Sequence, residues 1–299
     1  MINVFIFILC IIYMSAERLY QLANAPKSKS NSYKYKLTCQ DKINKDTPST
    51  DDWLELLKHL DHESDSVKIF QALLDKTKNV IVKVGLGTNI VEEYNIGEKL
   101  SVLKLPTFIS YYCHFSCVDS FKNLALKKGL CGSGNDSISV LVMPFIKLGR
   151  VDKAKWTRQN INTYKSILKH VVCTLLYAFE TCKFTHNDMH FGNILLKKTK
   201  KKEIVYGDRM TLSVIDGYIP VIMDYERAQF SDTLPLLYED IGKLFNLAGT
   251  EIDVKLNIAK LFVSKYIVNQ RQVTQQVYKE MCEFIDSRDI VYVLSEMMH

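Results

Sequence analysis

The sequence predicts an α+β fold with two lobes, a small lobe rich in β-strands and a larger helical lobe after it. Short apolar runs separated by turn-forming residues fill residues 51–146. From residue 147 onward the apolar residues recur mainly at helical spacing. Residues 1–50 differ from both lobes in composition, so we expect three segments: an N-terminal segment over 1–50, a first lobe over 51–146 and a second lobe over 147–299.

The composition excludes several classes of protein. Hydrophobic residues make up 47% and charged residues 24% of the 299 residues, which excludes wholesale disorder. The formal net charge of +6 is too diluted to predict direct binding to nucleic acid. The eight cysteines include no Cys-x-x-Cys pair, so we expect reduced thiols in an intracellular protein, cytoplasmic or nuclear. The stretch Cys113–Cys117 lies in a predicted strand, where neighbouring side chains alternate, so we expect no metal site there.

The N-terminal segment leaves three interpretations open. Val4–Met14 is an uninterrupted apolar run that is too short to span a bilayer, and no Lys or Arg precedes it to form a signal peptide. It can be a stretch upstream of a true start at Met14, a weak signal or anchor, or a buried helix. We favour the start at Met14 over Met1, and we expect membrane contact only if residues 1–14 are retained. Residues 24–50 are polar and basic, as in a tail or linker.

The elements of the first lobe follow from local patterns. Apolar residues at helical spacing predict a helix at its start, capped by Ser49 or Thr50, and these residues are Trp53, Leu56, Leu57 and Leu60. The remaining elements are expected in this order: strands over 67–74 and 79–84, a helix over 90–103, and strands over 107–115 and 138–145 with a loop over 129–137 between them.

A broad apolar stripe predicts a long buried helix over residues 160–181 of the second lobe. Short strands are expected at 194–196 and 219–223. The lysine-rich stretch 197–202 is more typical of a solvated turn than of a nucleic-acid patch. Most of the remaining chain is expected to be helical.

The most informative polar residues lie between Phe184 and Leu196, on a loop that joins the long helix to an apolar strand. Phosphoryl transfer needs a carboxylate that accepts the proton of the attacking hydroxyl, and Asp188 supplies one. It also needs oxygen ligands for Mg²⁺. The amide of Asn193, five residues later, and the carboxylate of Asp224, at the end of a later strand, suit that task.

These motifs resemble those of the protein kinase superfamily. The segment His186–Asn193 (HNDMHFGN) is similar to the catalytic loop, whose common form is H-R-D-x-x-x-x-N, and Asp224–Glu226 (DYE) stands where D-F-G is usual. Val80–Lys83 (VIVK) resembles the V-A-I-K strand. The resemblance extends from Val67 to Phe245 in the order of the family.

The resemblance implies a two-lobed protein kinase-like fold with ATP and Mg²⁺ as cofactors. Lys83 would steady the phosphates and be held by Glu92 or Glu93 of the following helix. We favour Glu93, because Ile96 and Gly97 then follow one turn later on an inward face. The other implied roles are nucleotide binding by Val67, Met143 and Phe145, metal binding by Asn193 and Asp224, catalysis by Asp188 together with Lys83, and support of the loop by His186 and Asp240.

Departures from the usual kinase motifs narrow the choice of subfamily that the sequence resembles. Ser64 and Ser66 stand where the phosphate loop has glycines, and Asn187 replaces the usual arginine. Only the short segment 225–239 separates Asp224 from Asp240, and no A-P-E motif follows it. We therefore expect no conventional activation loop and no need for activating phosphorylation.

His190, the D-Y pair and the long insert before Asp224 are together similar to haspin-type atypical kinases. This similarity implies a serine/threonine protein kinase whose partner is a protein with a Ser or Thr acceptor. Two alternatives stay open. Small-molecule kinases of the aminoglycoside and choline type share an H-N/G-D-x-H-x-x-N loop, and a pseudokinase that acts as a binding module would tolerate the missing glycines.

Overall fold

The structure is a computed structural model that describes residues 50, 53–60, 66–87, 89–126, 129–132, 134–245 and 273–287 of the chain. Several sequence predictions concern residues outside these ranges. They are those for Val4–Met14, for the tail over 24–50 except Thr50, and for Ser49 and Ser64. Within the ranges given, no helix has both the length and the apolar character that crossing a membrane requires.

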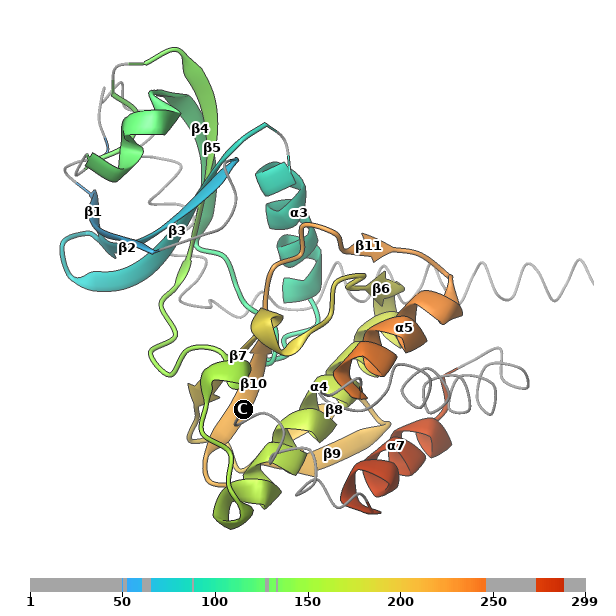
Figure 1. Ribbon diagram of the computed structural model, residues 1–299. Helices are drawn as coiled ribbons and strands as arrows, with labels where there is room; N and C mark the ends of the chain where they lie inside the picture. The colour runs from blue at the N-terminus through green and yellow to red at the C-terminus, as the bar shows by residue number, and fades with distance from the viewer. Residues whose placement is uncertain are drawn as a thin grey trace, which may run out of the picture.

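The first lobe is a five-stranded antiparallel sheet with one helix packed against it (Figure 1). The strands lie side by side in the order β1 (Leu54–Leu60), β2 (Val67–Leu74), β3 (Lys78–Leu86), β5 (Asp136–Pro144) and β4 (Cys113–Asp119). Helix α3 (Asn89–Ser101) follows β3, and the 3₁₀ helix η1 (Phe121–Leu126) follows β4. The predictions of strands at 67–74 and 79–84 and of a helix from residue 90 are confirmed.

The predicted helix at Trp53–Leu60 is wrong, because these residues form strand β1. β1 pairs with β2 along its length, and the register shifts between Leu56 and Lys58. Leu54 and Leu56 are buried at strand spacing, whereas Leu57 beyond them is 48% exposed. A bulge in an alternating strand therefore produced apolar spacing that imitates a helix. Thr50 does not cap a helix, and its hydroxyl accepts a hydrogen bond of 2.7 Å from the backbone N–H of Leu130.

The two faces of the sheet serve different cores. Val80, Val82 and Val84 of β3 lie on one face and form part of an apolar core that belongs to the first lobe. Lys83 lies between them in sequence and therefore faces the opposite side. On that side Leu141 and Met143 of β5 join the core that extends into the helical lobe. The alternation of β3 thus directs Lys83 toward the junction of the two lobes.

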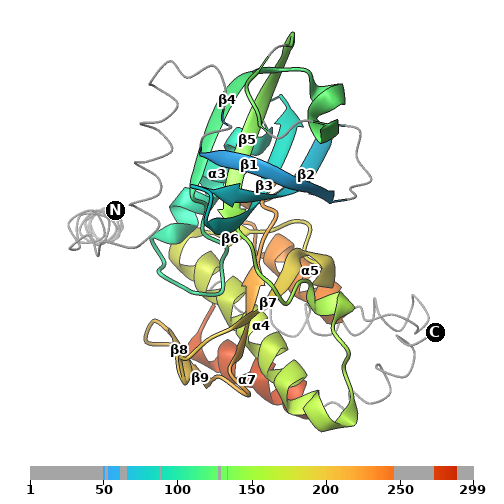
Figure 2. The same cartoon turned by 90° about the vertical axis from the view of Figure 1, so that its left-hand side faces the viewer.

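The second lobe is built around α4 (Ile161–Cys182), with α5 (Leu234–Phe245) and α7 (Gln275–Ser287) packed against it (Figures 1 and 2). The predicted long helix is confirmed, and the residues of its apolar stripe are buried: Ile167, Leu168, Val171, Val172, Leu175, Leu176 and Phe179. α4 ends at Lys183, which takes a left-handed conformation with φ 62° and returns its N–H to the carbonyls of Ala178 and Phe179.

Short strands pair in three places around α4. The pairs are β6 (Phe184–Thr185) with β11 (Gln229–Phe230), β7 (Ile194–Lys198) with β10 (Tyr218–Ile222), and β8 (Glu203–Tyr206) with β9 (Met210–Ser213). Three 3₁₀ helices complete the described elements: η2 (Val151–Lys153), η3 (Arg158–Asn160) and η4 (Phe191–Asn193). The lysine-rich stretch ends β7 and then forms an exposed connection to β8, as a solvated turn would. The small sheet lobe and the larger helical lobe confirm the predicted fold class.

The predicted strand over residues 107–115 begins too early. β4 starts only at Cys113, because Thr107 and Ile109 pair with the second lobe instead. The N–H of Ile109 donates to the carbonyl of Ile222 (2.9 Å), and the N–H of Ile222 donates to the carbonyl of Thr107 (2.8 Å). This crossing joins the chain that leads into β4 to the end of β10, two residues before Asp224.

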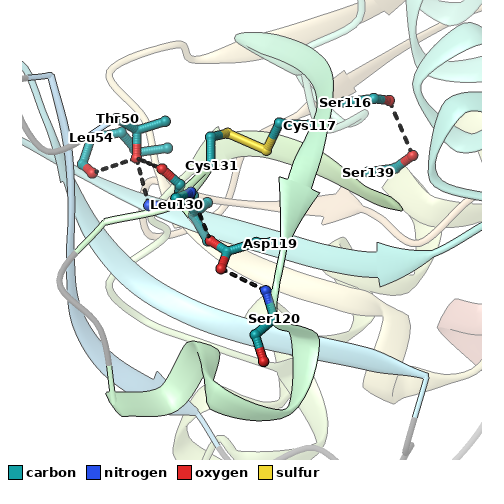
Figure 3. The surroundings of a disulfide bond; sticks show 10 residues. Thr50, Leu54, Ser116, Cys117, Asp119, Ser120, Leu130, Cys131 and Ser139 are labelled. Atoms are coloured by element: carbon teal, nitrogen blue, oxygen red, sulfur yellow. Dashed lines mark hydrogen bonds between the residues drawn. A yellow bond between two sulfur atoms is a disulfide. The ribbon is translucent and has the colours of Figure 1, made fainter. Parts of the chain in front are cut away.

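The expectation that all cysteines are reduced thiols is wrong. Cys117, in β4, forms a disulfide with Cys131, in the segment that leads to β5, and their Cα atoms are 5.4 Å apart (Figure 3). Two polar anchors bring this segment back beside β4. Thr50 binds the backbone of Leu130, and Asp119 accepts hydrogen bonds from the N–H groups of Ser120 and Gly132. Among the described cysteines, three carry free thiols: Cys173, Cys182 and Cys282.

Candidate active site

A buried ion pair joins the sheet to helix α3. Lys83 Nζ lies 2.8 Å from Glu93 Oε2 and 2.9 Å from Asp224 Oδ1. Lys83 and Glu93 are buried, whereas Glu92 is exposed. The structure therefore pairs Lys83 with Glu93 rather than Glu92. It also brings Asp224 to the same ammonium group from a distant part of the sequence.

The charges around Lys83 keep its side chain protonated. Burial by itself would lower the pKa of Lys83, but the carboxylates of Glu93 and Asp224 outweigh burial and raise that pKa above its usual value. A buried cation is tolerated only when it is paired in this way. Lys83 is thus a fixed positive charge between α3 and Asp224.

Tyr111 completes this cluster, and sequence analysis did not single it out. Its hydroxyl donates a hydrogen bond of 2.7 Å to Glu93 Oε1, so both oxygens of Glu93 have a partner. Burial raises the pKa of Tyr111 well above its usual value, which keeps the hydroxyl proton in place. The ring lies over Gly97, where a Cβ would come within 2.3 Å of Tyr111 Cε2. An aromatic run in the sequence around residues 108–115 was the available signal, and it was interpreted only as a strand.

The loop after β6 is held by two buried side chains. Asp240 Oδ2, in α5, accepts hydrogen bonds from the backbone N–H groups of His186 (2.7 Å) and Asn187 (3.1 Å). His186 Nε2 lies 2.9 Å from the carbonyl oxygen of Met223. Burial lowers the pKa of His186, which favours a neutral ring that donates from Nε2 to this carbonyl. These bonds lock the turn before Asp188 to α5 and to the segment that carries Asp224.

Asn193 connects the loop to the DYE segment. Its Nδ2 donates to the carbonyl of Asp188 (2.9 Å), and its own carbonyl accepts from the N–H of Met223 (3.0 Å). The next residue, Asp224, takes a left-handed conformation with φ 64°. Asn193 is therefore bonded to the backbone of Asp188 and to the residue that directly precedes Asp224. Among the described residues, no group of three or more His, Cys, Asp or Glu side chains forms a metal-binding cluster.

Two of the residues expected at the nucleotide, Val67 and Met143, lie on the face of the sheet that carries Lys83. In the register of the sheet Val67 is opposite Gly85, and Met143 is opposite Ile81, which places both on the side of Lys83. Met143 is buried and Phe145, directly after β5, is 37% exposed. A hollow of about 450 Å³ lies elsewhere, between Leu103–Pro106 and Lys201–Val205.

Tyr225 packs in an aromatic cluster where the two lobes meet. Its ring lies within 6.2 Å, centroid to centroid, of the rings of Phe108, Tyr111 and Phe184. Its hydroxyl donates to the carbonyl of Ile222 (2.9 Å) and accepts from the N–H of Ile109 (3.1 Å). The hydroxyl that distinguishes D-Y from D-F therefore bonds both to Ile109, in the segment before β4, and to Ile222, at the end of β10.

Two charged residues after Tyr225 also reach the site. Glu226 Oε2 lies 3.7 Å from Lys83 Nζ, and Arg227 Nη1 lies 3.7 Å from Asp188 Oδ1. The side chain of Asn187 donates to the carbonyl of Arg227 (3.0 Å). The replacement of the usual glycine by Glu226 was visible in the sequence. Only the structure shows that this carboxylate approaches Lys83.

Comparisons with known proteins find similar kinase sequences. The family model of the ABC1 atypical kinase-like domain matches residues 136–228, about a third of the chain, from β5 to just before β11. The chain is 31% identical over 117 residues to the serine/threonine-protein kinase haspin of Mus musculus and 30% identical over 129 residues to that of Bos taurus. These segments cover 37% and 40% of this chain.

The similarity covers only part of each relative. The matched segments span 15% and 16% of the two haspin proteins. A further segment of 61 residues, 20% of this chain, is 38% identical to 5% of a probable serine/threonine-protein kinase of Dictyostelium discoideum. Together with the two-lobed fold and the order of the motifs, these similarities support a protein kinase-like chain that is similar to haspin-type atypical kinases.

Proposed function

We propose that the chain is an ATP-dependent serine/threonine protein kinase that works with Mg²⁺. The observation that carries the proposal is the contact of 2.9 Å between Lys83 Nζ and Asp224 Oδ1. Phosphoryl transfer uses a cation such as Lys83 to bind phosphate and a carboxylate such as Asp224 to bind the metal. The same segment is bound through Met223 to Asn193, and Asn193 binds the backbone of Asp188. These contacts link the residues to which the proposal assigns phosphoryl transfer.

The donor set suits Mg²⁺. A hard cation prefers carboxylate and amide oxygens, and Asp224 and Asn193 supply them. Because Asn193 uses its Nδ2 on the carbonyl of Asp188, its side-chain oxygen is the atom left to act as a ligand. Bound Mg²⁺ would neutralise charge on the phosphate oxygens. In the proposed mechanism Lys83 steadies the phosphates, and Asp188 orients the acceptor hydroxyl and takes its proton.

The proposed nucleotide position follows from the sheet. Val67 and Met143 share the face of Lys83, so an adenine ring between them would place its phosphates toward the ammonium group. Backbone groups near Phe145 would bind the ring edge. His186 and Asp240 have a supporting role in the proposal, because their hydrogen bonds hold the loop and reach no group expected to react.

A protein acceptor is favoured by the names of the similar proteins, which are serine/threonine-protein kinases. The experiment incubates the purified full chain with Mg²⁺ and labelled ATP. The acceptors are histones, casein, a set of aminoglycosides, or choline. Nucleotide binding is followed separately by thermal shift. Asp188→Asn should keep nucleotide binding and lose most turnover, whereas Lys83→Met should impair both.

Asp208→Asn provides the control, because Asp208 is a highly exposed carboxylate in the turn between β8 and β9. It should leave turnover unchanged. Label on choline or an aminoglycoside, and none on protein, would replace the proposal with a small-molecule kinase. Nucleotide binding without transfer to any acceptor would indicate a pseudokinase. The absence of nucleotide binding would overturn both enzyme functions.

A further inference from the structure

A carboxylate bridges β3 and the first residue of α3. Glu226 Oε1 accepts a hydrogen bond of 3.2 Å from Asn89 Nδ2, while its Oε2 lies 3.7 Å from Lys83 Nζ. Asn89 is the first residue of α3, the helix that carries Glu93. A negative charge at the N-terminal end of a helix is also favoured by the helix dipole. Glu226 is thus placed to hold this end of α3 close to the DYE segment.

The position of α3 decides whether the ion pair of Lys83 forms. In protein kinases this ion pair and the metal-binding Asp must both be in place, and activation-loop phosphorylation commonly controls the helix. On its buried face, α3 is anchored by Gly97, which packs against Tyr111, and by Leu100, which is buried in the core. The contact with Glu226 is a polar anchor at the exposed N-terminal end.

We propose that Glu226 is a positioning residue that keeps α3, and through it Glu93, docked on Lys83 without any phosphate. Its side chain makes the contact with the helix that a phosphorylated residue makes elsewhere. This agrees with Asn187, which cannot form the charge-assisted pair that an arginine makes with a phosphate. The inference deepens the proposed function and rests on it, since its kinetic readout is phosphoryl transfer.

The test exchanges the hydrogen-bond donor and acceptor between residues 89 and 226. Asn89→Asp places two carboxylates opposite each other and should lower kcat about threefold to tenfold, the effect of losing one exposed charge-assisted bond. Adding Glu226→Gln restores a bond, because the introduced amide can donate to the introduced carboxylate. This double variant should return to within about twofold of the original rate. Treatment of the original protein with phosphatase should leave its rate unchanged.

Asn95→Asp is the matched control, because it adds the same charge at an exposed position of α3. Hydrogen exchange of residues 89–101 provides a readout that needs no activity. Exchange should rise in the Asn89→Asp variant and fall again in the double variant. An aspartate near the N-terminus would by itself stabilise a helix, so a purely local effect predicts the opposite change.

Three outcomes would overturn the inference. One is that Asn89→Asp alters neither the hydrogen exchange of residues 89–101 nor the rate of phosphoryl transfer. The second is a double variant no better than the single one. The third is that Glu226→Gln changes how the rate of phosphoryl transfer depends on the Mg²⁺ concentration, while Asn89→Asp has no effect. That result would make Glu226 a metal ligand. A failure of the proposed function is distinguishable, because the unaltered protein would then transfer no phosphate, although the exchange measurements would still respond.

Discussion

The hydroxyl of Tyr111 donates a hydrogen bond of 2.7 Å to Glu93 Oε1, on the side of the carboxylate away from Lys83. Tyr111→Phe keeps the ring over Gly97 but leaves this buried oxygen without its donor. We expect a loss of about 1–3 kcal/mol in the free energy of unfolding, measured in urea, together with a lower kcat. Tyr164→Phe is the control, since the buried Tyr164 hydroxyl has no hydrogen-bond partner among the described residues. Equal losses in the two variants would contradict the prediction.

Gly97 is required by the ring that covers it. Alanine is the better helix former by about 1 kcal/mol, but a Cβ at residue 97 would lie 2.3 Å and 2.5 Å from two carbons of Tyr111. The steric conflict should win, and Gly97→Ala should destabilise the protein by about 1–3 kcal/mol. Asn95→Ala, at an exposed position of the same helix, should be neutral or stabilising.

The same conflict can be relieved from the other side. Combining Gly97→Ala with Tyr111→Ala should cost less than the sum of the single changes, because the smaller side chain removes the atoms in conflict. Unfolding curves of the four proteins in this cycle measure the difference. Strict additivity would show that the ring is not what excludes a side chain at residue 97.

Asp240 holds the loop before Asp188 through two backbone N–H groups. Asp240→Ala leaves both of them buried without an acceptor, so we expect a loss of about 3 kcal/mol in stability and a lower rate. Asp240→Asn keeps one acceptor oxygen and should cost less. Glu239→Ala, the exposed neighbour on α5, should change the free energy of unfolding by less than about 0.5 kcal/mol. A mild effect of Asp240→Ala would argue against its supporting role.

His170 should make the stability of the second lobe depend on pH. Burial lowers the pKa of this histidine from 6.5 to about 4, and its ring is bound by Tyr206 and the carbonyl of Ser213. The folded state therefore holds the ring neutral where the unfolded chain would protonate it. The stabilisation is complete above pH 6.5 and is lost as the pH falls toward 4.

The loss at low pH should reach at most about 3 kcal/mol relative to a protein without this group. The measurement compares urea unfolding of the original protein and of His170→Gln at several values between pH 7 and pH 4. The variant should be less stable at pH 7 and show a shallower decline below pH 6.5. Parallel curves would mean that His170 does not titrate differently in the two states.

The disulfide between Cys117 and Cys131 should stabilise the first lobe. It closes a loop with a sequence separation of 14. A closed loop of this length contributes about 3 kcal/mol by restricting the unfolded chain. Replacing both cysteines by serine should therefore lower the melting temperature under oxidising conditions. Cys182→Ser, which removes a free thiol, should have a small effect.

The sequence by itself determined the order of the elements that carry the chemistry. The apolar stripe of α4 and the strand that carries Lys83 follow from local patterns, and both are present where they were predicted. The motifs around Lys83, Asp188 and Asp224 were visible because phosphoryl transfer needs a few residue types at set intervals. Glu93 was favoured over Glu92 from the helical period alone.

Only the tertiary structure decided the features that depend on a partner distant in sequence. β1 is a strand because β2 lies beside it, and the disulfide forms because the chain returns to β4 after η1. The roles of Tyr111 and Glu226 depend on side chains from different elements meeting at α3. Local periodicity reports which face of an element is apolar, but it carries no information on which groups the folded chain brings to that face.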